Sequence, residues 1–233
     1  MGVYNIIAPV SPHTSPYNYL TDANSKTAWT LWGSHIKNAA KLANVPANII
    51  YAFMMVESKG IKASADKNPS TPGLMQWNPH YAFEVIEKEK NNGRMSIAEE
   101  EFLATKGIKF VKVGTKYQIS GTPITQVGIE RRIAKATTID PWLNIYIGAM
   151  YLGQYMDESW GKDTNGTVRM DRIVARYNGG QGAFKSRSIG TKTTDAILAD
   201  PSLPVITKNY IKQVIGTNGT LHTGLSLDLP KTV

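Results

Sequence analysis

The chain has 233 residues and a formal net charge of +8, from 26 Lys and Arg against 18 Asp and Glu. With 42% hydrophobic and 19% charged residues it can bury a core, which excludes a chain that is disordered throughout. It has no cysteine, and its four histidines lie far apart, which excludes disulfides and thiolate metal sites and argues against a histidine metal site. We therefore expect no metal and no cofactor.

The excess of basic residues favours an anionic partner, such as nucleic acid, a membrane surface or an acidic cell-wall polymer. Nucleic acid is disfavoured, because the densest basic clusters, at positions 88–90 and 131–132, are short and mixed with Glu. No apolar run approaches the roughly 18 residues that span a bilayer, so we expect no membrane insertion. The first 20 residues lack the basic and apolar regions of a secretory signal, and we expect synthesis in a cytoplasm.

The first half of the chain begins with a segment rich in Pro, Ser and Asn, and residues 1–25 are predicted to be irregular. Apolar residues at helical spacing then predict a helix over 26–43. A second helix is predicted over 47–59, with Asn44 as its N-cap and Gly60 as its left-handed C-terminal residue.

Prolines and a glycine make residues 61–79 a predicted loop. Helices are predicted at 80–90 and at 96–105, the latter with the spacing of a capping box. Alternating apolar and polar residues predict a β-hairpin over 108–120. Asp at the N-cap and Pro at the first position predict a helix over 140–160.

The last third of the chain contains two further helical patterns, at 168–178 and 204–215. Residues 217–233 are predicted to form a turn-like C-terminal tail. No repeat and no linker interrupts residues 26–216, so we expect one mainly helical domain there.

Glu57 is the most informative residue of the chain. At helical spacing it shares one face of the 47–59 helix with three apolar residues, Ile50, Phe53 and Met54. Burial and the nearby helix C-terminus both disfavour an anion, so we expect a raised pKa for Glu57, as a general acid at neutral pH requires. The alternative is a Glu that leaves the core at the helix end and meets solvent.

Four short motifs follow one another along the chain: Glu57-Ser58 with Gly73-Leu74-Met75-Gln76, then Asn144, Gly148 and Tyr151-Leu152, then Tyr177-Asn178-Gly179-Gly180, and finally Tyr210. This ordered set, spanning 46–215, resembles the catalytic domain of the soluble lytic transglycosylase family. The resemblance implies a lysozyme-like fold, α+β and mainly α. The stretch before Asp140 is longer than in compact members of that family, so residues 80–139 are expected to be an insertion that carries the small β-hairpin.

The resemblance also implies an activity, cleavage of the β-1,4 bond between N-acetylmuramic acid and N-acetylglucosamine in peptidoglycan. Glu57 would protonate the glycosidic oxygen. Once ionised, it would take a proton from the C6 hydroxyl of the muramic sugar, which leaves a 1,6-anhydro product. The acetamido carbonyl of the sugar would assist, so no protein nucleophile is needed.

By position in these motifs, the residues expected to bind substrate are Ser58, Asp66, Met75, Gln76, Tyr177, Asn178 and Tyr210. Asp66 stands where family members often carry Ser, which leaves Ser64 and Ser70 as alternatives. On pattern alone, three of the motif residues have structural explanations: Tyr177 as a core aromatic, Asn178 as a helix C-cap and Asn144 as a packing residue.

Two other functions remain open on the sequence, a hydrolytic lysozyme of the goose type and a non-catalytic wall-binding protein of a phage particle. The hydrolase would need a second carboxylate to activate water. We expect a monomer that acts on peptidoglycan glycan strands. The expected delivery is that of a bacteriophage lysin, by holin release or as a virion component, with a bacterial secretion-associated enzyme as the alternative.

Overall fold

The chain is mainly helical, with a few short strands that pair two by two. The computed structural model describes residues 6–7, 11–19, 23–61, 71, 73–120, 128–130, 133, 135, 140–186 and 188–226. Within these residues, no helix combines the length and the apolar character needed to cross a membrane.

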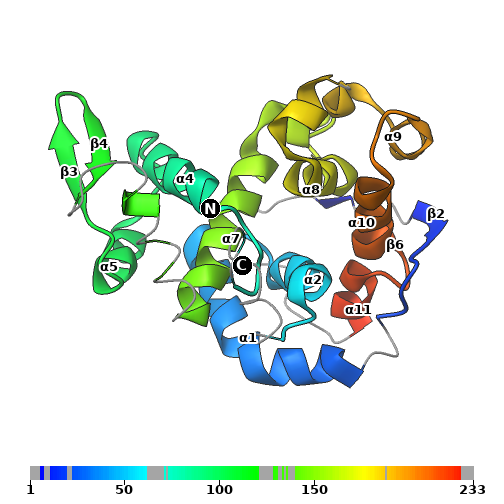
Figure 1. Cartoon of the computed structure of the whole chain (residues 1–233), viewed down its shortest axis with the longest axis horizontal. Helices are drawn as coiled ribbons and strands as arrows, with labels where there is room; N and C mark the ends of the chain where they lie inside the picture. Colours follow the sequence, from blue (N-terminus) through cyan, green and yellow to red (C-terminus); the bar gives the residue numbers. More distant parts are fainter. Residues whose placement is uncertain are drawn as a thin grey trace.

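Helix α2 (Ala47–Ser58) lies at the centre of the fold, and all of its residues up to Met55 are buried. The long helices α1 (Ala23–Ala43) and α7 (Pro141–Asp157) pack against α2 and against each other (Figure 1). A helix that is apolar on every side needs such enclosure, because no face of it can meet water without cost. The three helices therefore form the frame on which the rest of the chain is assembled.

Helix α8 (Met170–Ser186) packs on α10 (Val205–Ile215), which also contacts α2. α8 continues past its predicted end, but Gly180 (φ 72°, ψ 173°) interrupts the helical backbone within it. Short elements connect these helices: the 3-10 turns Ser159–Gly161 and Ile189–Thr191, and helix α9 (Thr194–Ala199).

The N-terminal segment is not irregular throughout. Strand β1 (Ile6–Ile7) pairs in parallel with β5 (Val168–Arg169), and β2 (Ser11–Thr14) pairs in parallel with β6 (Gly216–Thr217). The prediction for residues 1–25 is therefore wrong at both strands and at the start of α1. Its local composition is that of a loop, but distant strands supply the hydrogen bonds that the backbone needs.

The predicted turn-like tail is wrong where the structure describes it. After β6 the chain forms helix α11 (Thr220–Ser226), which packs closely on α2 and buries Leu221 and Thr223. So short a helix, with Gly224 inside it, has little stability of its own. Docking against α2 holds it in place, and local sequence patterns do not report such docking.

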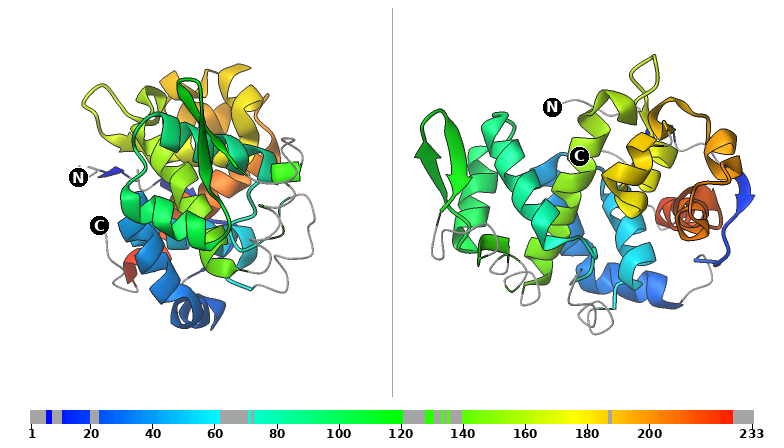
Figure 2. Two further views of the ribbon diagram at one scale, coloured as in Figure 1. Left: turned by 90° about the vertical axis from the view of Figure 1, so that its left-hand side faces the viewer. Right: turned by 45° about the horizontal axis from the view of Figure 1, so that its top comes forward.

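A lobe beside α7 contains helices α4 (Pro79–Asn91) and α5 (Ile97–Thr105) and the antiparallel hairpin of β3 (Phe110–Val113) and β4 (Lys116–Ile119) (Figures 1 and 2). Helix α4 packs on α7 and also contacts strand β4. The hairpin confirms the prediction, and its two-residue turn begins at Gly114 with φ +61°.

Local capping chemistry correctly predicts two helix starts and misses one. Ser96 and Glu99 form the predicted capping box of α5, and the Asp140 carboxylate accepts two backbone N–H groups at the start of α7. Asn44, the predicted N-cap of α2, has φ +52° instead, and Pro46 occupies the N-cap position. The proline fixes its own φ and displaces the cap by two residues.

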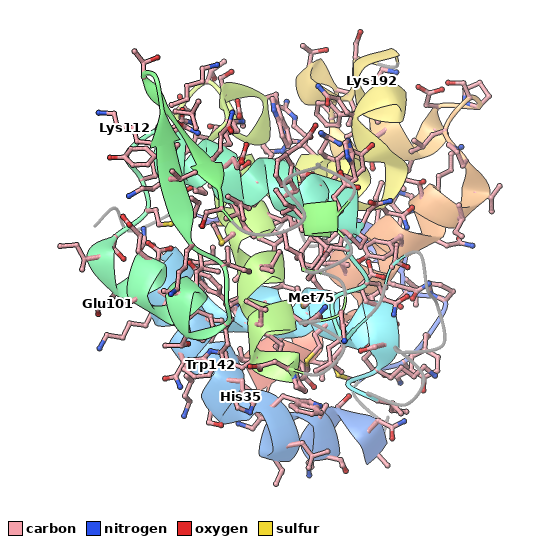
Figure 3. All side chains as sticks on the ribbon, turned by 60° about the vertical axis from the view of Figure 1, so that its left-hand side comes forward. His35, Met75, Glu101, Lys112, Trp142 and Lys192 are labelled. Carbon is pink, nitrogen blue, oxygen red and sulfur yellow. The ribbon has the colours of Figure 1, made fainter. Side chains whose placement is uncertain are left out.

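The loop that precedes α4 is held on α7 by Asn144, which is fully buried. The Met75 N–H donates to Asn144 Oδ1 at 2.8 Å, and Trp77 Nε1 donates to the Asn144 carbonyl at 2.9 Å. Met75 packs beside α7 on Gly148, where an added Cβ would lie 2.7 Å from Met75 Cγ (Figure 3). A Cβ at Gly73, which has φ +89°, would overlap the Asn144 side chain. The Gly-Leu-Met-Gln motif therefore packs closely against α7, at Asn144 and Gly148.

We expect Gly73→Ala to lower the free energy of unfolding by about 3 kcal/mol or more, because left-handed strain adds to the overlap with Asn144. Gly93→Ala is the matched control, since Gly93 has φ +66° with no atom within 4 Å of an added Cβ, and should cost only about 1 kcal/mol. Urea denaturation of both variants measures the difference. Equal costs would show that Asn144 does not confine this loop.

Candidate active site

A cleft of about 410 Å³ opens beside the C-terminal end of α2. Its walls come from α2, the loop before α4, and helices α4, α7 and α8. Polar and aromatic side chains line it together, with two glycines of the third motif at one edge. The lining residues are Glu57, Thr71, Gln76, Trp77, Asn78, Tyr81, Tyr151, Tyr155, Arg176, Tyr177, Asn178, Gly179 and Gly180.

Glu57 lines this cleft from the last turn of α2. One of its carboxylate oxygens, Oε1, accepts a hydrogen bond from the Tyr210 hydroxyl at 2.5 Å. Burial raises the pKa of Glu57 to about 8, and the Tyr210 hydrogen bond, which favours the ionised form, offsets only part of that rise. At neutral pH the Glu57 side chain is therefore mostly a neutral acid that faces a cleft.

Aromatic rings surround the acid on its protein side. The Phe53 ring centroid lies 4.9 Å from that of Tyr177 and 6.3 Å from that of Tyr210. The Tyr177 hydroxyl donates to the Met75 carbonyl oxygen at 2.8 Å. The first and third motifs are thus tied together by a hydrogen bond, and the low polarity around Glu57 follows from the rings.

Two amide side chains lie at the cleft wall. Gln76, with φ +50°, donates through Nε2 to the Gly73 carbonyl at 3.0 Å and accepts from Thr71 Oγ1 at 3.3 Å. Asn178 Oδ1 accepts from Thr207 Oγ1 at 2.9 Å, and no described residue accepts from its Nδ2. An amide held in this way can present its remaining polar atoms to hydroxyl or acetamido groups.

The structure brings four of the predicted site residues into one cleft: Glu57, Gln76, Tyr177 and Asn178. Tyr210, also expected to bind substrate, does not line the cleft in the described structure: it is buried and its hydroxyl donates to the Glu57 carboxyl, which it holds in place. Asp66, with its alternatives Ser64 and Ser70, lies outside the described residues.

Ser58 and Met75, both expected to bind substrate, do not line the cleft in the described structure. Ser58 Oγ donates to the Met54 carbonyl at 3.2 Å and accepts from the Gly60 N–H at 3.2 Å, so it closes the end of α2. The Met75 side chain is fully buried against α7. Hydroxyl capping and close packing explain why these residues occupy their positions.

Sequence reasoning missed an aromatic wall of the cleft. Tyr151 and Tyr155 lie four residues apart on α7, and Tyr81 on α4 faces the same space. The Tyr151–Tyr155 spacing is visible in the sequence and predicts a shared helix face. That α4 lies opposite this face depends on how the lobe packs on α7, which the spacing does not report.

A second cavity of about 570 Å³ adjoins the first, and the two share four lining residues, Tyr81, Tyr151, Tyr155 and Arg176. Trp160 and Phe184, whose ring centroids are 4.6 Å apart, extend its aromatic lining. The two cavities therefore form one elongated groove between α4, α7 and α8. Its length and mixed polar and aromatic lining suit a polymer with alternating apolar faces and polar edges.

Comparison with models of known protein families, with curated proteins and with solved structures found no match. The geometry of the groove and the four motifs therefore carry the functional interpretation by themselves.

We expect Tyr210→Phe to raise the pKa of Glu57 above its value of about 8, by about one unit, because the lost hydrogen bond stabilises the ionised carboxylate. NMR titration of ¹³C-labelled glutamate side chains measures this pKa. In the control Tyr177→Phe, whose hydroxyl donates to Met75, the pKa should change by less. A pKa that falls in Tyr210→Phe would contradict the assigned direction of this hydrogen bond.

Proposed function

We propose that the protein is a peptidoglycan lytic transglycosylase with a lysozyme-like catalytic domain, and that Glu57 is its general acid and then its base. One observation carries the proposal: Glu57 is a carboxyl with a pKa of about 8 that lines an elongated groove. Holding an acid in its neutral form at pH 7 costs stability, since the unfolded chain would ionise it freely. General acid catalysis is the chemistry that such an acid serves.

In the first step, the proton of Glu57 moves to the glycosidic oxygen as the bond from that oxygen to C1 of the muramic sugar breaks. The acetamido oxygen of the same sugar bonds to C1 and takes up its developing positive charge. Gln76 and Asn178, held by Gly73 and Thr207, are placed at the groove wall to hold hydroxyl or acetamido groups.

In the second step, the ionised Glu57 takes the proton of the C6 hydroxyl. The C6 oxygen bonds to C1, the acetamido oxygen leaves, and a 1,6-anhydro ring forms without consuming water. Glu57 ends protonated and ready for the next cycle, and its raised pKa favours this proton return. The Tyr210 hydroxyl keeps the carboxylate oriented throughout, because it can donate to either protonation state.

The positions of the carboxyl groups in the groove support transglycosylation rather than hydrolysis. Among the described lining residues of the Glu57 cleft there is no second carboxyl. Glu84 and Glu158 line the adjoining cavity, where they lie 3.4 Å from His80 and 2.6 Å from Lys88. A hydrolase needs a second carboxyl close to the acid, and no described lining residue of the Glu57 cleft supplies one.

We expect Glu57→Gln to reduce lysis of purified peptidoglycan by about two to four orders of magnitude, the loss typical for a general acid. Gln keeps an acceptor for the Tyr210 hydroxyl, so the fold should be unchanged. Glu101→Gln, at an exposed position of α5 labelled in Figure 3, makes the same Glu-to-Gln exchange away from the groove and is the control. A folded Glu57→Gln variant with full lytic activity would refute the assignment.

We expect the released muropeptides to carry 1,6-anhydro ends, which makes them lighter by one water than the products of hydrolysis. Mass spectrometry of digested peptidoglycan, with and without borohydride reduction, distinguishes the two, because only reducing ends gain hydrogen. Reducing-end products would identify the protein as a goose-type hydrolase instead. Binding to the wall without any soluble product would identify a wall-binding protein.

A further inference from the structure

Arg176 is the one ionic side chain in the groove that has no counter-charge among the described residues. Lys88 pairs with Glu158 at 2.6 Å, and Glu84 lies 3.4 Å from His80. Glu57 is mostly neutral at pH 7. Arg176 is therefore the one cation in the described lining of the groove that no carboxylate of the protein holds.

The position of Arg176 is central to the groove. It lies on α8 directly before Tyr177 and lines both cavities, so it stands where they join. Its guanidinium carbon lies 5.1 Å from the centroid of the Tyr155 ring, a cation–π contact that orients the group without using its hydrogen bonds. No described residue accepts from its N–H groups, and these donors remain for a ligand.

We propose that Arg176 binds a carboxylate of the peptide attached to the glycan strand, and so selects strands that carry peptides. This inference rests on the proposed function. The planar fork of a guanidinium matches a carboxylate with two parallel hydrogen bonds. In peptidoglycan the lactyl carboxyl of the muramic sugar is consumed in its amide link to the peptide, so free carboxylates come from the peptide itself.

A carboxylate fits this position better than a phosphate of a wall polymer. A phosphate group is usually held by several cations, whereas Arg176 acts alone and Lys88 is already paired. Because Arg176 also lines the Glu57 cleft, the bound peptide would set which glycosidic bond lies beside the acid.

The test is binding of two soluble probes, a disaccharide–tetrapeptide with free carboxyls and the same molecule with every carboxyl converted to an amide. Calorimetry with the Glu57→Gln variant avoids turnover. We expect the free acid to bind about 10- to 100-fold more tightly, the range for a charged hydrogen-bonded pair. Equal affinities would overturn the inference and leave the proposed function intact, whereas no binding of either probe would contradict both.

Variants of the protein test whether Arg176 causes the preference for the probe with free carboxyls. Arg176→Gln should abolish it, and Arg176→Lys should retain only part, because the charge remains while the paired hydrogen bonds are lost. Lys112→Gln, at an exposed site on the β3–β4 hairpin labelled in Figure 3, changes net charge equally and should keep the full preference. A preference that survives in folded Arg176→Gln would overturn the inference, as would displacement by inorganic phosphate at equal or lower concentration than by acetate.

Discussion

The enclosure of α2 is the physical constraint on which the site depends. The helix is buried along most of its length, and Glu57 is placed in its last turn, where the apolar surroundings meet the cleft. Water can reach the carboxyl from the groove but cannot solvate it from the protein side, which is why its pKa rises to about 8. The raised pKa of Glu57 thus follows from its position in the last turn of a buried helix.

The remaining motif residues hold the surroundings of that acid in place. Asn144 accepts from the Met75 N–H, and the Met75 carbonyl accepts from Tyr177. These two bonds link α7, the loop before α4, and α8 through a single residue of the loop. Motifs far apart in the chain are therefore one assembly, in which each backbone group of Met75 has a side-chain partner from a different helix.

The groove adds a level of organisation that extends beyond the acid. Aromatic rings from α4, α7 and α8 continue its wall away from Glu57, and Arg176 marks the junction between its two cavities. In the second cavity Lys88 pairs with Glu158 and Glu84 lies 3.4 Å from His80, while Arg176 faces the groove over Tyr155. Such a wall offers mainly stacking contacts, with few charged groups among them.

Much of this protein could be predicted from its sequence alone. Helical periodicity located most helices, and local chemistry identified the hairpin turn at Gly114 and the cap at Asp140. Periodicity also placed Glu57 on a buried face, which was sufficient to predict the direction of its pKa shift. Each of these features depends on residues within a few positions of one another, so a short stretch of chain carries the information.

Only the tertiary structure decided which side chains meet. Ser58 and Met75 stand inside the motifs but turn to the protein interior, whereas Tyr81 and Arg176 stand outside them and line the groove. The strands near the N-terminus and helix α11 form because distant segments supply partners. Their hydrogen bonds and buried contacts join residues far apart in the chain, and local patterns in a single sequence do not specify such pairings.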